Sequence, residues 1–479
     1  MGVLSALEPK EVFHYFEEIC SIPHPSYKEE KISNYLVDFA KKKGLEYYQD
    51  DLKNVIIIKE ATKGYEDVEP IILQGHMDMV CEKEPDCDID FEKDGLSLQV
   101  DGDFVSAKGT TLGGDDGIAL AYALTIMDSD SIPHPRIEFI CTVSEEVGME
   151  GATGIDLSML KGKRLLNIDS EEEGIFLVGC AGGCGAECSL PLNWEKAEGE
   201  ILEIRIEGLI GGHSGVEIHK GRGNSNILMG RILLETFSDT PFRVAELEGG
   251  KKDNAIPRET KAKVLVQDVE GFKQSVEKAA KAIKEEYAVT DPEFKVTVTS
   301  LEESVEKVLD EETSKKVIVL LNTLPNGIQT MSANISGLVE TSLNMGVLKL
   351  EKDQLILRFS LRSSVKTAKE YLRKKIECIL KQFGGTVQFR GDYPAWEYKK
   401  DSKLREDMVK LYETMYGKTP EIQAIHAGLE CGILAGKIEG LDCVSLGPDI
   451  FSIHTTEEKL SISSTKRVWE YLLEVLKSK

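Results

Sequence analysis

The sequence contains no long apolar run: no stretch approaches the ~18 consecutive apolar residues that a membrane-spanning helix needs. Positive charge is also in short supply, because 58 Lys and Arg residues face 83 Asp and Glu residues, a formal net charge of −25. A field of this sign repels nucleic-acid phosphates and anionic lipids. We therefore expect a soluble protein of enzyme size, with neither nucleic acid nor a membrane as a partner.

A secretion signal is missing as well. The chain does not open with a basic segment followed by an apolar one, so we expect a cytoplasmic protein whose ten cysteines stay reduced. Cys180, Cys184 and Cys188 recur at intervals of four, a spacing found neither in Cys-x2-Cys zinc pairs nor in ferredoxins. We expect these three residues to be buried thiols.

Hydrophobic patterning divides the chain into three stretches. Residues 1–186 hold short runs that are apolar on both faces, typical of central strands in an α/β sheet covered by helices. Residues 187–396 carry longer alternating strands and amphipathic helices, typical of an α+β unit, and residues 397–479 return to the first pattern. We predict an α/β domain that is interrupted by an α+β domain and then completed. The strands expected early in the chain are Val55–Ile58, Ile71–Leu73, Ile137–Cys141 and Leu165–Ile168, with a helix over Ile118–Met127.

Histidine is scarce, with eight copies, so the position of each one is informative. His76 and Asp78 follow the apolar run Ile71–Leu73, and their spacing of two places both side chains on one face of a strand. A metal-bound imidazole usually donates its second ring N–H to a carboxylate, so His76 is a candidate ligand and Asp78 its orienting partner. Taken alone, the pair is better explained as a structural or surface contact.

Two adjacent carboxylates, Asp115 and Asp116, stand in the glycine-rich segment Gly109–Gly117 directly before the predicted helix. Glycine gives the backbone the freedom to bring Asp115 close to a cation. A helix N-cap by either acid explains the position equally well. A phosphate-binding loop is a weaker alternative, because the phosphate-loop motif is missing and two acids repel a phosphate.

Further carboxylates and a second histidine follow other predicted strands. Glu145 and Glu146 are consecutive, so their side chains diverge, and one can ligate a metal while the other handles protons. Asp169 directly follows Leu165–Ile168, and His454 lies in the loop after the apolar run Cys443–Leu446. Each alone is typical of a solvated strand end. The residues expected to share the crevice at the carboxyl ends of the strands are His76, Asp115, Glu145, Glu146, Asp169 and His454.

This set of side chains exceeds the needs of one metal ion. Two imidazoles and three carboxylates suit a pair of zinc-like ions that share an aspartate. Ions ~3.5–4 Å apart lower the pKa of a bridging water and polarise a carbonyl, while the remaining glutamate takes and returns protons. The pattern predicts metal-assisted hydrolysis of an amide bond.

Motifs spread over nearly the whole chain point to one known group. They are Leu7–Phe13, Gly75–Asp78, Thr110–Gly117, Glu145–Glu146, Gly211–Gly215, His426–Gly432 and Gly447–Pro448 with His454. These motifs resemble those of the dinuclear zinc exopeptidases, which include carboxypeptidase G, peptidase T, aminoacylase and the dipeptidases. Within that group, the sequence is most similar to the cytosolic aminoacyl-histidine (Xaa-His) dipeptidases.

The resemblance implies a fold and a role for each candidate residue. The fold is a three-layer α/β catalytic domain interrupted by an α+β lid domain, used for substrate closure or dimerisation. In this scheme the first zinc ion is held by His76 and Asp169, the second by Glu146 and His454, with Asp115 bridging, Glu145 as general base and Asp78 as orienter.

The resemblance also implies substrate-binding residues. His213 in Gly211–Gly215 would stabilise the developing oxyanion, although a polar turn residue is the alternative. Arg362 would bind the substrate carboxylate, with Arg358 as a competing assignment. Asn254 would face the substrate and Glu430 would meet its free amino group, but a turn asparagine and a helix-start glutamate explain these two equally.

The implied activity is hydrolysis of dipeptides, either of the Xaa-His type or of broad specificity, by a hydroxide bridging two divalent ions. Zn²⁺ is the expected metal, with Co²⁺ and Mn²⁺ as alternatives. A tripeptide aminopeptidase, an N-acyl amino-acid hydrolase and a non-catalytic metal-binding homologue are the rival functions. Glu145 argues against the last of these, because a silent homologue has no use for an unligated glutamate there. The expected partner is a small peptide, and both a monomer and a homodimer stay open.

Overall fold

The computed structural model describes residues 2–302 and 307–478, which form two compact units. The first unit comprises the chain up to Gly179, then Tyr398–Ala424 and Leu429–Lys479. The second unit comprises Cys180–Glu397 and the short segment Ile425–Gly428. Within the described ranges, no helix has both the length and the apolar character needed to cross a membrane.

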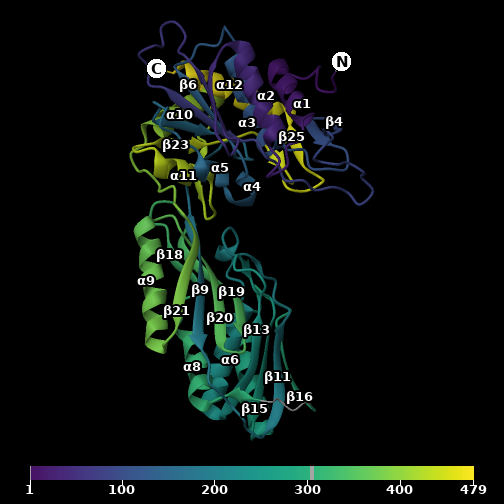
Figure 1. The fold of residues 1–479 in the computed structure, drawn as a ribbon, viewed down its shortest axis with the longest axis vertical. Helices are drawn as coiled ribbons and strands as arrows, with labels where there is room; N and C mark the ends of the chain where they lie inside the picture. Colours follow the sequence, from purple (N-terminus) through teal and green to yellow (C-terminus); the bar gives the residue numbers. More distant parts are fainter. Residues whose placement is uncertain (1, 303–306, 479) are drawn as a thin grey trace. The chain divides into compact units, whose positions relative to one another are not determined.

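The first unit, in which β6 and β23 are labelled in Figure 1, is built on an eight-stranded sheet. In spatial order its strands are β1 (Glu46–Gln49), β2 (Val55–Lys59), β6 (Ile137–Thr142), β3 (Ile71–His76), β7 (Arg164–Asn167), β23 (Asp442–Ser445), β8 (Ile175–Cys180) and β22 (Glu421–Ile425). The four central strands β6, β3, β7 and β23 run parallel to one another. Every residue of β3 and of β6 is buried, because helices cover the sheet. The predicted α/β class is confirmed.

Helices surround this sheet and include one that is almost wholly buried. They are α1 (Lys10–Cys20), α2 (Glu30–Lys43), α3 (Gly114–Asp128), α4 (Glu145–Gly148), α5 (Glu150–Gly154), α10 (Lys403–Tyr416), α11 (Glu430–Lys437) and α12 (Ile462–Lys477). α3 packs against both β3 and α1, and its residues from Gly114 to Met127 are all buried. A small sheet of β24 (Ile450–Phe451), β25 (Lys459–Ser461), β5 (Phe104–Ala107) and β4 (Leu98–Asp101) completes the unit.

The second unit is a nine-stranded antiparallel sheet with helices on one face. The strand order is β16 (Lys295–Leu301), β11 (Glu200–Glu207), β15 (Thr260–Val266), β13 (Phe242–Gly249), β19 (Val339–Leu350), β20 (Gln354–Ser363), β9 (Gly182–Pro191) and β21 (Thr386–Tyr393), with β18 (Gly327–Met331) paired to β19. Short pieces are β10 (Trp194–Glu195), β17 (Val308–Leu309), β12 (Gly212–His213), β14 (Ala255–Ile256) and the 3₁₀ turn η1 (Ile218–Lys220). The helices are α6 (Ser225–Asp239), α7 (Val269–Glu286), α8 (Glu311–Thr323) and α9 (Lys366–Phe383).

The core of the second unit follows the period of two expected for strands. Alternate residues of β20 (Leu355, Leu357, Phe359 and Leu361) face the same apolar cluster as the buried residues of all four helices. Cys184 and Cys188 of β9 belong to this cluster, and Cys180 is buried as well. The prediction of three buried thiols is therefore confirmed.

Candidate metal centre and active site

His76 stands at the carboxyl end of β3 and is 1% exposed. Its ring atom Nδ1 lies 2.9 Å from the main-chain oxygen of Asp78, which assigns the Nδ1 proton to that bond. The other ring nitrogen, Nε2, is 3.0 Å from Asp115 Oδ1 and 3.6 Å from Asp169 Oδ1. The imidazole is thus held at Nδ1 and turns Nε2 toward two carboxylates on its other side.

Asp115 lies between the two candidate histidines. Its Oδ1 faces His76, while its Oδ2 is 3.2 Å from His454 Nε2. His454 Nε2 is also 2.8 Å from Glu146 Oε1. Asp115, Glu146 and His454 offer ligand atoms that all lie within 4.8 Å of one another, as do those of His76, Asp116 and Asp169. The structure therefore brings together all five predicted ligands, and adds Asp116.

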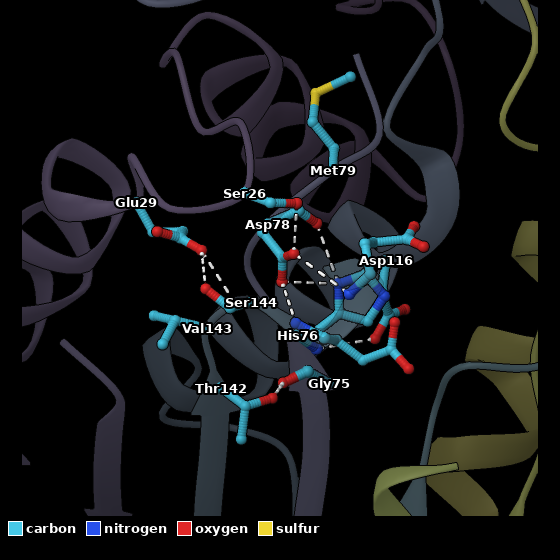
Figure 2. A network of polar contacts seen from close by, with 12 residues as sticks. Ser26, Glu29, Gly75, His76, Asp78, Met79, Asp116, Thr142, Val143 and Ser144 are labelled. Carbon is cyan, nitrogen blue, oxygen red and sulfur yellow. Dashed lines mark hydrogen bonds and ion pairs between the residues drawn. The ribbon is translucent and has the colours of Figure 1, made fainter. Parts of the chain in front are cut away.

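Asp78 lies beside His76 and Ser26 (Figure 2) and also contacts the backbone of the two glutamates. The buried carboxylate accepts hydrogen bonds from the Oγ of Ser26 at 2.8 Å and from the main-chain N–H groups of Glu145 at 2.9 Å and Glu146 at 3.3 Å. Burial opposes ionisation, but its contacts with His76 lower the pKa of Asp78 below its usual range. Asp78 therefore fixes the start of α4 as well as the imidazole.

The two imidazoles face an excess of negative charge. Burial acts to lower the pKa of His76, but hydrogen bonds with Asp115, Asp169 and Asp78 raise it well above its usual value. Hydrogen bonds with Asp115 and Glu146 raise the pKa of His454 to about 10. Both rings therefore favour a cationic partner or proton at the nitrogen that faces the carboxylates.

The carboxylates of the site repel one another and are poorly hydrated. Burial raises the pKa of Asp169 to about 6, and burial also raises the pKa values of Asp116 and Glu145 well above the usual carboxyl range. Nearby Glu171 has its pKa raised to about 7 by burial and by the charges of Asp115 and Asp169. Such a cluster needs positive charge to be stable in its ionised form, and its oxygen and imidazole donors fit divalent cations.

Several residues of the site were missed by sequence reasoning. Glu29 accepts hydrogen bonds from the N–H and the hydroxyl of Ser144, both at 2.9 Å, directly before Glu145 (Figure 2). Ser26 and Glu171 were also missed, and Asp116 was considered only as a cap. The one signal in the sequence is that Asp116 directly follows Asp115 and that Glu171 lies two residues after Asp169, whereas nothing local marks Ser26 or Glu29.

Comparison with known proteins identifies the family of this chain. The model of peptidase family M20/M25/M40 matches residues 72–478. The chain belongs to this peptidase family. Over 481 aligned residues it is 37% identical to the cytosol non-specific dipeptidase of Escherichia coli K12, covering 100% of this chain and 99% of the relative.

Solved structures agree with this family assignment. The crystal structure of aminoacylhistidine dipeptidase from Vibrio alginolyticus matches with a TM-score of 0.94 and 36% identity, covering 99% of this peptidase and 97% of that chain. Aminopeptidase PepT from Bacillus cereus ATCC 10987 matches with a TM-score of 0.56 and 19% identity over 98% of both chains, which shows a shared fold. The resemblance drawn from the motifs and the prediction of a peptidase are confirmed.

Three predicted substrate-binding residues of this M20 peptidase lie in its second unit. His213 ends β12, and its Nδ1 accepts hydrogen bonds from the main-chain N–H groups of Gly215 and Val216, both at 3.2 Å. This assigns the ring proton to Nε2, which is then a donor. Burial, followed by the charge of Arg362, lowers the pKa of His213, which favours the neutral ring. Asn254 is exposed, and its main-chain oxygen accepts from the N–H of Ser214.

Arg362 and His426 share the surroundings of Gly215. A Cβ at Gly215 would lie 2.7 Å from His426 O and 3.0 Å from Arg362 Nε, so only glycine fits between them. Arg362 donates from Nη1 to the hydroxyl of Tyr393 at 3.0 Å, and its Nε is buried without a hydrogen-bond partner in the described chain. His426, given no role from the sequence, pairs with Ser342 Oγ at 2.7 Å.

Glu430 is the first residue of α11 in the first unit and is 0% exposed. Its Oε2 accepts hydrogen bonds from Gln74 Nε2 and from Thr142 Oγ1, both at 2.6 Å. Because its side chain has no exposed surface, a contact with a substrate amino group would require its neighbours to move. That role stays a prediction: a buried structural carboxyl explains the two hydrogen bonds at Oε2, while Oε1 is buried without a hydrogen-bond partner among the described residues.

The protonation of Glu430 predicts a pH-dependent stability of the metal-free protein. Burial raises its pKa to about 8, so the folded state retains a proton that the unfolded state releases near pH ~4.3. The free energy of unfolding therefore falls as pH rises between these values. Glu430→Gln cannot release this proton, so the variant does not lose stability in this way. The difference in unfolding free energy between the variant and the wild type should therefore grow in favour of the variant by up to about 1.4 kcal/mol for each unit that the pH rises.

Chemical denaturation in the presence of a chelator, at several pH values from 5 to 8, measures this difference. Glu439→Gln is the matched control, because Glu439 is exposed in the residues that follow the same helix. A difference between Glu430→Gln and the wild type that does not change with pH would contradict the assignment of a retained proton.

Proposed function

We propose that this peptidase hydrolyses dipeptides with the help of two divalent metal ions held by His76, Asp115, Glu146, Asp169 and His454. The observation that carries the proposal is the position of Asp115, with one carboxylate oxygen beside each imidazole. A carboxylate in this position can share its two oxygens between two cations. Two relatives at 36–37% identity over nearly their whole length carry the name dipeptidase.

The ligands divide into two groups around Asp115. His76 and Asp169 form one group, and Glu146 and His454 the other, as the distances from the imidazole nitrogens support. Zn²⁺ suits this mixture of imidazole and carboxylate donors, with Co²⁺ and Mn²⁺ as alternatives. When bound, two such ions would polarise the scissile carbonyl and lower the pKa of the attacking water.

Glu145 is proposed as the general base. Its main-chain N–H is anchored to Asp78, while its carboxyl belongs to the same close group as His76 and Glu146. Burial raises its pKa well above the usual value, which suits a group that receives a proton from water and passes it to the leaving amine. Asp78 holds the imidazole of His76 and the backbone of both glutamates, so it is proposed as the orienting residue.

The second unit is proposed to bind and cover the substrate. Among the described residues, the buried Nε of Arg362 has no hydrogen-bond partner, which makes it a suitable donor for the carboxylate of a dipeptide, and Asn254 lies on the same unit. His213 carries its proton on Nε2 and can donate it to an oxyanion. A cytoplasmic location is proposed from the name of the Escherichia coli relative, and a homodimer is one alternative for its assembly.

Substrate class is tested by a screen of the Zn²⁺-, Co²⁺- and Mn²⁺-loaded protein. We expect cleavage of free dipeptides, with Xaa-His peptides compared directly with other dipeptides because the names of the two relatives differ on this point. Tripeptides and N-acetylated dipeptides serve as the comparison. Faster turnover of tripeptides or of N-acylated substrates would replace the dipeptidase proposal with one of its two rivals.

His213→Ala is expected to lower turnover by roughly 10²–10³-fold, the usual cost of losing one oxyanion donor. Metal content should not change, because the proposed ligands all belong to the first unit. Dipeptide turnover and elemental analysis measure the two effects. Full activity of the variant would remove His213 from the mechanism.

Mixing His213→Ala chains with Glu145→Gln chains decides which chain supplies the imidazole. Recovered activity would show donation between subunits. No recovery in a confirmed heterodimer would place His213 in the active site of its own chain.

A further inference from the structure

The loop that carries His454 also carries a buried carboxylate, Glu458, which is 2% exposed. Its Oε2 accepts hydrogen bonds from the main-chain N–H groups of Leu112 at 2.7 Å and Gly113 at 3.1 Å. Its Oε1 accepts from those of Gly114 at 2.8 Å and Asp115 at 3.4 Å. One carboxylate thus binds four consecutive backbone donors, the last of which belongs to Asp115.

The sequence of the Asp115 segment makes this contact possible. Gly113 has a φ of +66°, a conformation that residues with a Cβ rarely adopt. A Cβ at Gly114 would lie 3.2 Å from Glu458 Oε1, closer than most Cβ contacts. The two glycines therefore allow the backbone to turn its N–H groups toward Glu458 and let the carboxylate approach.

A short turn, held by hydrogen bonds between its own residues, separates Glu458 from His454. The main-chain N–H of Glu458 donates to the oxygen of Thr455 at 3.2 Å, and Thr455 Oγ1 donates to the oxygen of Ser452 at 2.7 Å. His454 itself has a φ of +60°. Both ends of this short segment therefore contact Asp115. The side chain of His454 contacts the Asp115 carboxylate, and the side chain of Glu458 accepts a hydrogen bond from the Asp115 main-chain N–H.

Stabilising the start of α3 is a simpler role for Glu458. An anionic group at a helix N-terminus is favourable through the helix dipole and the unpaired N–H groups. A residue from any neighbouring loop would serve that purpose. The simpler role does not explain why this residue comes from the His454 loop. From that loop, Glu458 joins the segments that carry two proposed ligands, Asp115 and His454.

We propose that Glu458 is a positioning residue that sets the separation of Asp115 and His454, and with it the affinity of the metal position these two residues share. The inference rests on the proposed function, since it assigns Asp115, Glu146 and His454 to one metal ion. Loss of an outer partner of metal ligands typically weakens metal binding by about 10–100-fold. The other position, at His76 and Asp169, has its own support in Asp78.

Glu458→Gln is the direct test. Glutamine keeps the length of the side chain but replaces one acceptor oxygen with an NH₂ group, which cannot accept from the two N–H groups it would face. Metal-depleted full-length protein is titrated with Zn²⁺ against a chromophoric chelator. We expect one of two binding steps to weaken by about 10–100-fold and the other to keep its wild-type affinity.

A second readout separates positioning from general stability. At limiting Zn²⁺ the variant should have a lowered kcat that rises toward the wild-type value as Zn²⁺ is added, with little change in KM. Glu457→Gln is the matched control, because Glu457 is the exposed neighbour and loses the same charge. It should bind Zn²⁺ as the wild type does.

Glu458→Asp covers the case in which the glutamine variant does not fold. Aspartate keeps the charge but is one methylene shorter, so it cannot reach all four donors, and we expect a smaller loss at the same binding step. The proposal would be overturned if a folded Glu458 variant bound both Zn²⁺ ions with wild-type affinity but had a lowered melting temperature. Only the helix-capping role would then be left. Fewer than two Zn²⁺ ions on the wild type would instead overturn the proposed function, and the positioning role with it.

Discussion

Replacing Glu145 with Gln is expected to lower dipeptide turnover by roughly 10²–10⁴-fold while both metal ions stay bound. The amide cannot take a proton from water, so the chemical step loses its base. The metal ligands keep their geometry, because Asp78 holds residue 145 through its main-chain N–H rather than through the side chain. Turnover at saturating substrate and metal content of the same sample measure the two effects.

Glu146→Gln provides the comparison at the neighbouring position. Glu146 Oε1 lies 2.8 Å from His454 Nε2 and is a proposed ligand, so its neutralisation should weaken metal binding first. Added metal should therefore restore part of the activity of Glu146→Gln and none of the activity lost in Glu145→Gln. Near-full activity of the Glu145 variant would assign the base to another residue.

The α/β framework was predictable from the sequence because its central strands are buried on both faces. The apolar runs Val55–Ile58 and Ile137–Cys141 correspond to β2 and β6 to within one residue. The helix predicted over Ile118–Met127 is part of α3, which begins at Gly114 and therefore includes Asp115 and Asp116. Runs of this kind have few alternatives to a covered sheet.

The gathering of the ligands was predictable for a related reason. His76 ends β3, and Asp169 follows β7 by two residues. β3 and β7 are adjacent and parallel, so their carboxyl ends meet at one edge of the sheet. His454 comes from far along the chain, but it lies in the segment that follows β23, the parallel neighbour of β7, so the same pattern of strand ends predicted its place.

Contacts that depend on tertiary structure were not predictable. No local pattern in the sequence indicates that Glu430 and Glu458 are buried, yet both are, and both hold segments distant from them in the chain. The segment Ile425–Gly428 belongs to the second unit although the residues on both sides of it belong to the first. Local composition carries no sign of either feature, because burial of a single polar residue is decided by what packs against it.

The position of Asp115 leads to the other large expected effect. Asp115→Ala removes both oxygens of the carboxylate that lies between His76 and His454, so neither metal position keeps its full ligand set. We expect the wild type to bind about two divalent ions per chain and this variant fewer than one under the same conditions. Turnover should fall by roughly 10³-fold or more, since several kcal/mol of charge stabilisation are lost at ~1.4 kcal/mol per factor of ten.

Asp169→Ala is the control that distinguishes loss of a ligand to one metal position from loss of a shared ligand. Asp169 lies near His76, with 3.6 Å between Oδ1 and Nε2, and belongs to only one of the two proposed positions. Its loss should therefore weaken the binding of one ion and leave the binding of the other unchanged, whereas Asp115→Ala should weaken the binding of both. Elemental analysis after gel filtration, followed by titration with Zn²⁺, counts the ions and their affinities. If Asp115→Ala retained one ion at wild-type affinity, Asp115 would be a ligand of a single metal, and the two positions would be independent of each other.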